Sequence, residues 1–487
     1  MWRRGLVFRL RLDGPDPQRS GYDRRGDRDM TVRTIWYGCR TVAAIVVLLY
    51  GMASAGHRGV VWSASREQSG TLPLSRSAAS QQVAFRASAA TVEITPQKPT
   101  WLSGYGPRQS DGVLDPIHHK VVALDAGGTP FYLISSDLCL FSPAFYDSVM
   151  REFQEAMGID PKHVLWSVTH SHSAPEIGPP DMYKTLLGRS DHEWDREYTR
   201  FAISALLEAV NRAREKLEPA RVVFGTGTSM ANINRRAKDV DGRVSIGLNP
   251  DGPVDRQFNL IRLTRPDGSV IALVVNYAMH GTVMNGQNLK VSGDAPGVVA
   301  AYLEEQLGAP VLYINGAAGN IAPIYSVYPS ASAGHLSEFR VLLGDRVLSA
   351  VRALGVGTGD VSIRHGEKVV ETPRKPELDW PESLAAYGRT DAGQLLVRLP
   401  IRFVRINDTL IWSAPVEMFC DIAMDVRERS PFSNTFYFGY TNGWLGYLPT
   451  AKTFEEGGYE TRTSPFTPQV EIDVRQAVTT FIDGLRR

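Results

Sequence analysis

The sequence has few cysteines and almost no net charge. Three cysteines among 487 residues, Cys39, Cys139 and Cys420, are too few for a disulfide framework or a four-thiolate metal site. The sequence leaves open whether Cys139 and Cys420 pair. Lys and Arg number 53 and Asp and Glu 52, which gives a formal net charge of +1. A protein with this balance lacks the broad basic surface that binds nucleic acid by bulk electrostatics.

Signatures of several common enzyme classes are also missing. The chain contains no G-x-S-x-G nucleophile elbow, no G-x-x-x-x-G-K-[ST] phosphate loop and no H-E-x-x-H zinc motif. Hydrophobic residues make up 43% and charged residues 22%, as in ordinary globular proteins and unlike disordered ones. The sequence therefore predicts a globular protein whose chemistry must come from other residues.

The first eighty-five residues have the pattern of a targeting segment and a spacer. We expect 1–29 to be an extension upstream of the true start at Met30. An arginine-flanked apolar run in 30–55 ends in the small-residue sequence Ala53-Ser54-Ala55, which is typical of a signal peptide. An uncleaved N-terminal membrane anchor remains the alternative. Residues 56–85, rich in Ser, Ala and Gln, are predicted to be a flexible linker. We therefore expect export to the periplasm or the extracellular space.

Residues 86–487 are predicted to form a single α/β domain of mixed β-sheets flanked by helices. Continuous apolar runs indicate strands that are covered on both faces. These strands are expected at 120–126, 131–136, 163–169, 221–225, 258–264, 270–277, 310–315, 409–414 and 435–440. Helices are expected at 143–157, 193–217, 296–307, 336–354 and 470–485. The polar stretch 366–395 is interpreted as a surface excursion.

Two histidines follow one of the predicted strands. His170 and His172 lie two residues apart at a strand end, a spacing that places both imidazoles on one face. They could form a metal or catalytic site, or they could be two hydrogen-bonded histidines in a polar loop. His280 leaves the strand 270–277 into a Gly-Thr turn. It could likewise point into a site or be a satisfied core histidine.

A carboxylate and a group of aromatic residues follow later strands. Glu417 comes after an apolar strand and opens a predicted helix, where it could be a metal ligand or simply a carboxylate that stabilises the helix dipole. The segment 441–450 is rich in glycine and aromatic residues. Tyrosines in such loops usually pack, but the glycines favour a shaped wall that contacts a substrate.

The order of these motifs resembles a known family. The chain contains T-H-x-H-S-x-P at 169–175, H-G-T at 280–282, P-x-E at 415–417, and Tyr447 followed twelve residues later by Tyr459-Glu460. This series is similar to that of the neutral, non-lysosomal ceramidases, and in particular to short bacterial members. The resemblance implies one ceramidase-like catalytic domain without the family's C-terminal immunoglobulin-like domain.

The resemblance also implies a zinc-dependent amidohydrolase that cleaves ceramide or a related N-acyl lipid with a zinc-activated water. A lipid-like substrate would bring the protein into peripheral contact with membranes. The residues that match the family's zinc ligands are His170, His280, Glu417 and Tyr447; His172 matches its catalytic histidine, and Arg235 and Tyr459 match its substrate-binding residues. Two imidazoles and a carboxylate suit Zn²⁺, which lowers the pKa of a bound water to about 7.

Two positions depart from the family pattern. The family's Gly-Asn/Asp-x-Ser-Pro segment reads here Gly319-Asn320-Ile321-Ala322-Pro323, so no serine nucleophile is available at 322. Glu456 stands near a position where the family has a cleft tyrosine. Two alternatives therefore stay open: an amidase or esterase of the same fold with a non-sphingolipid substrate, and a catalytically silent surface protein that binds a ligand.

Overall fold

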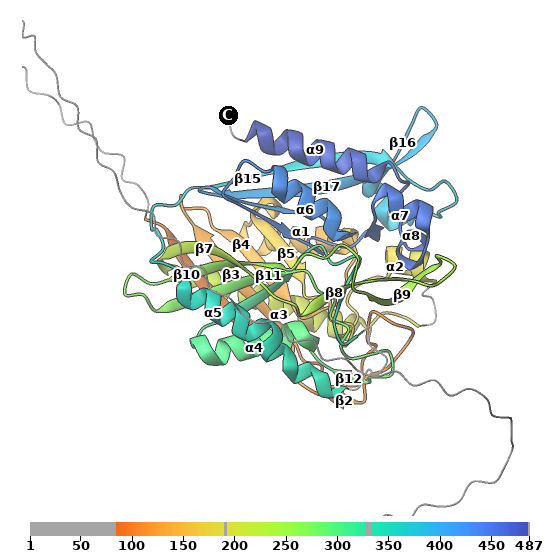
Figure 1. Cartoon of the computed structure of the whole chain (residues 1–487). Coiled ribbons are helices and arrows are strands. Elements are labelled where there is room, and N and C mark those ends of the chain that lie inside the picture. Colours follow the sequence, from red (N-terminus) through yellow and green to blue (C-terminus); the bar gives the residue numbers. More distant parts are fainter. Residues whose placement is uncertain (1–83, 189–191, 327–332, 486–487) are drawn as a thin grey trace, which may run out of the picture. The chain divides into compact units, whose positions relative to one another are not determined.

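The computed structural model describes residues 84–188, 192–326 and 333–485 (Figure 1). These residues all belong to one unit, Ser77–Arg487. The predicted extension, signal segment and nearly all of the predicted linker lie outside the described residues. Within the described part of the chain, every helix is too short or too polar to cross a lipid bilayer.

The first sheet has five strands in the order β5-β4-β3-β1-β6. Its strands are β1 (Arg86–Glu93), β3 (His118–Asp125), β4 (Phe131–Ser136), β5 (Val164–Val168) and β6 (Glu218–Pro219). β4 and β5 are parallel, and the other pairs are antiparallel. Helices α1 (Pro143–Met157) and α3 (Arg196–Glu215) pack on one face of this sheet, where the buried residues of α3 form the apolar stripe that the sequence predicted.

The second sheet has four strands in the order β13-β11-β10-β7. Its strands are β7 (Arg221–Thr228), β10 (Gln257–Thr264), β11 (Val270–Tyr277) and β13 (Val311–Asn315). Helices α4 (Asp294–Leu307) and α5 (Arg346–Ala353) cover its outer face. The predicted helix 336–354 is wrong as one element, because a 3₁₀ turn (Ala333–Glu338) and a π-helical turn (Arg340–Asp345) precede α5. Gly344 in the π turn lies against the Tyr302 ring, where a Cβ would come within 2.6 Å of it.

The third sheet corrects the prediction for 366–395. It runs β15-β17-β18-β20, and β16 also pairs with β17. Its strands are β15 (Ile363–Pro373), β16 (Gly388–Asp391), β17 (Gln394–Ile406), β18 (Thr409–Ser413) and β20 (Asn434–Phe438). β15 is an edge strand, and most of its side chains are exposed or half-buried. Its composition is therefore as polar as that of a surface loop. Helices α6 (Cys420–Arg429) and α9 (Val470–Gly484) pack against this sheet (Figure 1).

Smaller elements complete the fold and carry many of the candidate site residues. Three short sheets consist of β14 with β8 and β9, β2 with β12, and β19 with β21. The strands are β2 (Gly112–Val113), β8 (Asn232–Lys238), β9 (Val244–Asn249), β12 (Lys290–Val291), β14 (Ile321–Pro323), β19 (Glu417–Met418) and β21 (Tyr447–Leu448). The short helices are α2 (Asp181–Leu187), α7 (Ala451–Glu456) and α8 (Tyr459–Arg462), and 3₁₀ turns occupy Pro161–His163 and Glu382–Tyr387.

The three large sheets share a buried core. Packing in this core holds the strands, and with them the residues that follow their carboxyl ends. Apolar side chains from all three, such as Val122, Val274 and Ile411, belong to one buried cluster. β5 is parallel to β4, and β11 is parallel to β13. β5 is followed by His170 and β11 by His280, so both histidines leave rigid, buried strands at their carboxyl ends.

Candidate active site

The loops that carry the three histidines are held together through a glycine. Gly281 accepts a hydrogen bond from the backbone N–H of His172 (2.8 Å) and pairs with Ser171 in an isolated bridge. A Cβ on Gly281 would lie only 2.6 Å from the carbonyl oxygen of His170. His170 itself has φ +63°, a conformation that is uncommon for a side-chain-bearing residue and that recurs at functional sites. The close backbone approach brings the His170 and His280 side chains together.

Three of the four predicted metal ligands converge. Nε2 of His170 lies 3.4 Å and Nε2 of His280 lies 3.1 Å from the same oxygen, Oε2 of Glu417. All three residues are at least 98% buried. Nε2 of His172 lies 3.1 Å from Nε2 of His170, so a third imidazole borders the cluster.

The contacts of the opposite ring nitrogens leave Nε2 of each ring as the electron-pair donor toward the cluster when the ring is neutral. Nδ1 of His280 is 2.8 Å from the carbonyl oxygen of Ile321, and Nδ1 of His170 is 3.1 Å from that of Cys139. Because a carbonyl oxygen only accepts, both Nδ1 atoms must carry the proton. Histidines that bind metals are oriented in this way. Three electron-pair donors packed this closely repel one another unless a proton or a cation lies between them.

The pKa values of His280, Glu417 and His170 indicate that the cluster attracts a proton or a cation. Burial, followed by the charge of Arg235, lowers the pKa of His280 to about 3, so its imidazole is neutral. Burial raises the pKa of Glu417, but His170 and His280 lower it well below its ordinary value overall, so the carboxylate is ionised. Burial opposes protonation of His170, whereas Cys139 and Glu417 raise its pKa to about 10. The negative charge of the cluster thus attracts either a proton to His170 or a metal cation.

Two aromatic side chains that the sequence did not single out hold the Glu417 carboxylate. The indole Nε1–H of Trp444 donates to Oε1 at 2.9 Å, and the hydroxyl of Tyr440 donates to Oε2 at 3.2 Å. The Tyr440 ring also stacks on His170, with centroids 4.2 Å apart. Both residues lie in or beside the glycine- and aromatic-rich segment, so its composition was the available signal. The two donors orient the carboxylate toward the histidines.

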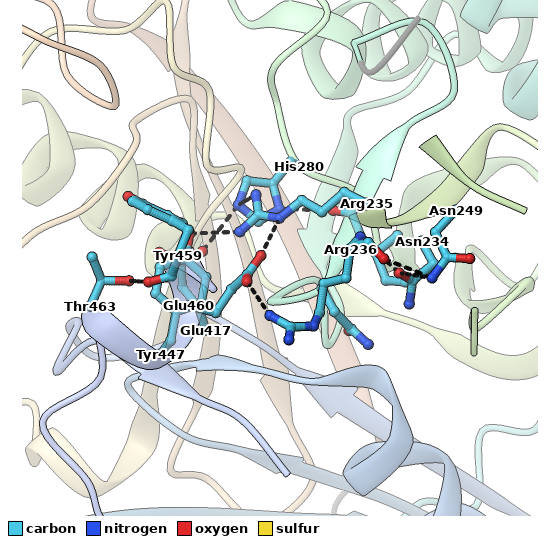
Figure 2. A network of polar contacts seen from close by, with 12 residues as sticks. Asn234, Arg235, Arg236, Asn249, His280, Glu417, Tyr447, Tyr459, Glu460 and Thr463 are labelled. Atoms are coloured by element: carbon cyan, nitrogen blue, oxygen red, sulfur yellow. Dashed lines mark hydrogen bonds and ion pairs between the residues drawn. The ribbon is translucent and has the colours of Figure 1, made fainter. Parts of the chain in front are cut away.

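The fourth predicted ligand, Tyr447, lies beside this cluster. β21 pairs with β19 so that Tyr447 is directly opposite Glu417. Its hydroxyl accepts a hydrogen bond from Nη2 of Arg235 at 3.0 Å, while Nη1 of Arg235 is 2.9 Å from Nε2 of His280 (Figure 2). Burial raises the pKa of Tyr447, so its phenol stays protonated near neutral pH. The predicted substrate-binding Arg235 is therefore in direct contact with two predicted ligands.

An open cavity of about 550 Å³ adjoins the cluster. Its walls include the predicted residues His172, Arg235, Tyr447 and Tyr459, together with Ala322. Burial, and then the neighbouring His170 and His280, lower the pKa of His172, which is therefore neutral. The volume is in the range of small-molecule sites.

The His172 ring lines this cavity, and Gly104 covers its Nδ1 side closely. Nδ1 of His172 is buried and has no hydrogen-bond partner within the described parts of the chain. Gly104 lies against the same ring, where a Cβ would come within 2.3 Å of it.

Two other expectations concern residues around the site. Cys139 and Cys420 are buried, free thiols, so the bridge that the sequence left open is not formed. Sγ of Cys139 is 3.7 Å from Nδ1 of His170, and together with His172 these residues form a second group of metal-type side chains that shares His170.

Glu456 forms ion pairs with Arg236 (3.4 Å) and Lys238 (2.9 Å). It is thus held in an ion-pair network.

Comparison with known proteins relates the chain to one family. Residues 105–336 match the model of the neutral/alkaline non-lysosomal ceramidase N-terminal domain. The chain is similar to this ceramidase family over that segment, which is just under half of its length. The match contains His170, His172, Arg235 and His280, whereas Glu417 lies beyond its end.

Individual ceramidases agree with this similarity. Neutral ceramidase B of Dictyostelium discoideum is 26% identical over 229 residues, which are 44% of this chain and 30% of the relative. The neutral ceramidase of Pseudomonas aeruginosa is 22% identical over 224 residues, which are 43% of this chain and 32% of the relative. The matched segment thus spans about a third of the length of these relatives.

The fold of the chain is that of a solved ceramidase. The crystal structure of the Pseudomonas aeruginosa neutral ceramidase superposes with a TM-score of 0.66 over 83% of this chain and 74% of that chain, at 17% identity. A structure described as a ceramidase complexed with C2 superposes with a TM-score of 0.67, at 16% identity and with 83% of this chain and 75% of that chain covered. The predicted mixed α/β fold of the ceramidase type is therefore confirmed.

Proposed function

We propose that the chain is a zinc-dependent hydrolase that cleaves the amide bond of ceramide or a related N-acyl lipid. The observation that carries this proposal is the convergence of His170 Nε2 and His280 Nε2 on Glu417 Oε2, at 3.4 and 3.1 Å, beside a cavity. Similarity to the ceramidase family supports the choice of substrate class. The roles of the individual residues below are part of the proposal.

Zinc is the cation that this donor set fits. Three of its ligands would be His170, His280 and Glu417, because two imidazole nitrogens and one carboxylate oxygen match catalytic zinc sites. Tyr447 would complete the set, since it lies opposite Glu417 on the paired strand. When bound, the ion would act as a Lewis acid that polarises the amide carbonyl and makes water more acidic.

The protein's own side chains would bind the substrate and move the proton. His172 is neutral, lines the cavity and lies 3.1 Å from His170, so it can stabilise the developing oxyanion or protonate the leaving amine. Arg235 and Tyr459 line the same cavity and would orient the N-acyl group. Ala322 also lines it and has no hydroxyl, so its side chain cannot serve as the acyl acceptor.

The proposed location is outside the cytoplasm, in contact with lipid. The sequence Ala53-Ser54-Ala55 after an apolar run is the basis for this proposal. N-terminal sequencing of the exported protein should give a mature chain that begins near Gly56. A full-length chain recovered only from the cytoplasmic fraction would contradict export.

A substrate screen on metal-depleted and zinc-restored protein tests the proposed function. The panel would contain N-acylsphingosines of several acyl lengths, N-acyl amino acids and simple carboxylic esters. We expect zinc-dependent release of fatty acid from at least one N-acylsphingosine. Hydrolysis restricted to the other amides or to esters would indicate a different substrate class. Zinc binding without hydrolysis of any compound would instead indicate a binding protein.

A further inference from the structure

Two consecutive arginines of β8 reach one carboxylate, that of Glu460. Nε of Arg235 lies 3.0 Å from Oε1, and Nη1 of Arg236 lies 2.6 Å from Oε2 (Figure 2). Neighbouring side chains of a regular strand point to opposite faces of the sheet. The pairing of β8 with β9 shifts register between Asn234 and Arg236, and such an irregularity redirects a side chain. This shift allows both guanidinium groups to turn toward Glu460.

The turn before Glu460 is shaped to receive Arg236. The carbonyl oxygen of Gly457 accepts a hydrogen bond from Nη2 of Arg236 at 2.8 Å. Gly458 has φ +105°, and a Cβ there would come within 3.0 Å of Nη1 of Arg236. Glycine therefore meets both the backbone and the space requirements at this position. The arrangement ties β8 to the start of α8.

The ion pairs of Glu460 are buried, so loss of its carboxylate should disturb the structure around it. Glu460 is 1% exposed, and Arg235 and Arg236 are each 5% exposed. Loss of the carboxylate would leave two buried cations without their common partner, and buried charges in that state move or recruit water. The segment around Glu460 would be disturbed first, together with the two arginines.

Glu460 is connected to the candidate active site through Arg235, and its chain neighbour Tyr459 also lies there. Arg235 donates hydrogen bonds to Glu460 and Tyr447, lies 2.9 Å from Nε2 of His280 and lines the cavity. Tyr459 precedes Glu460 in α8, lines the cavity and contacts the Tyr447 ring edge-on, with centroids 5.6 Å apart. Glu460 thus contacts one predicted substrate-binding residue and is the chain neighbour of the other.

We propose that Glu460 is a positioning residue that fixes Arg235 for binding of the N-acyl substrate. This inference rests on the function proposed above. Glu460 acts through Arg235, so its removal should weaken substrate binding and leave the three converging metal ligands in place.

Glu456 provides a matched control. It also forms an ion pair with Arg236, at 3.4 Å, but its other cationic partner is Lys238. Its side chain is 22% exposed, compared with 2% for Glu460. Glu456→Gln therefore removes a carboxylate of the same type from the same arginine without touching the contact to Arg235.

Kinetics of Glu460→Gln, Glu460→Asp and Glu456→Gln, with zinc content measured in each, test the role in substrate binding. A misplacement of Arg235 by about 1 Å should raise KM of Glu460→Gln by about 10-fold or more. Glu460→Asp should recover part of this loss, and Glu456→Gln should stay within about 2-fold of the wild type. In an Arg235→Met background, Glu460→Gln should cause no further rise in KM. Equal KM values for Glu460→Gln and Glu456→Gln, or additive effects with Arg235→Met, would overturn the proposal.

Hydrogen exchange separates this proposal from the function on which it rests. In Glu460→Gln, amides of Asn232–Lys238 and Tyr459–Arg462 should exchange faster than in the wild type, and in Glu456→Gln they should not. A wild-type protein without hydrolytic activity would refute the proposed function, and the exchange comparison would then decide the positioning role. Unchanged exchange in Glu460→Gln would refute that role in either case.

Discussion

The hydrogen bond from Trp444 to Glu417 gives the sharpest prediction. The indole Nε1–H lies 2.9 Å from Oε1 of Glu417, and both side chains are at least 97% buried. Trp444→Phe keeps an aromatic ring but leaves this carboxylate oxygen without its donor. A hydrogen bond to a charged group contributes about 1.5–3 kcal/mol. Loss of an outer partner of a metal ligand typically lowers metal affinity about 10–100-fold. The two estimates agree, so we expect a fall in zinc affinity of this size.

Trp412→Phe is the control for the change of ring size. Trp412 is also fully buried, but its Nε1 has no hydrogen-bond partner among the residues that the structure describes. The two substitutions remove similar volume, and only one of them removes a bond to the cluster. Trp412→Phe should therefore lower thermal stability and leave zinc affinity within about 2-fold of the wild type.

Competition with a chromophoric chelator measures both affinities. The reasoning predicts that Trp444→Phe releases zinc to the chelator at about 10–100-fold lower chelator concentration than Trp412→Phe does. Tyr440→Phe, which removes a longer bond of 3.2 Å to the other oxygen, should show a smaller loss. Equal affinities for Trp444→Phe and Trp412→Phe would refute the idea that the indole N–H orients Glu417.

Three further predictions address catalysis and stability. His172→Ala should lower turnover about 100-fold or more with zinc retained, because a proton donor is lost and no ligand is removed; loss of zinc in this variant would make His172 a ligand. Ala322→Ser should leave the rate nearly unchanged, and a large gain with an accumulating acyl-enzyme would contradict this. Burial lowers the pKa of His119 to about 4, so the unfolded chain takes up the proton first as the pH falls. The stabilisation from neutral His119 is complete above about pH 6.5 and is lost toward pH 4, by about 3 kcal/mol in total. Chemical denaturation at several pH values should show this slope in the wild type, and an equal slope in His119→Gln would contradict it.

The central strands could be predicted from the sequence, because burial on both faces produces continuous apolar runs. Phe131–Ser136 and Val270–Tyr277 have the predicted bounds, as does helix α1. β15 could not be predicted in this way. It is an edge strand with a solvated face, so its composition matches that of a loop. The π turn before α5 also escaped prediction; in it Gly344 lies against the ring of Tyr302, which is distant in the sequence.

In the candidate site, too, some features could be predicted from the sequence and others could not. His170, His172 and His280 follow buried strands, so the sequence alone indicated where they lie. Glu460 was visible in the sequence as part of a motif, but its contact with two arginines depends on a register shift in β8. Sequence periodicity contains no information about such a shift.

Zinc titration of metal-depleted protein, with hydrolysis of a short-chain N-acylsphingosine measured at each step, tests the central claim most directly. If His170, His280, Glu417 and Tyr447 hold one catalytic zinc ion, activity should rise in proportion to added zinc and reach a plateau at one equivalent per chain. His280→Ala should show neither tight binding nor activity in the same titration. Full activity in the metal-depleted protein would contradict the account, as would saturation with zinc without hydrolysis.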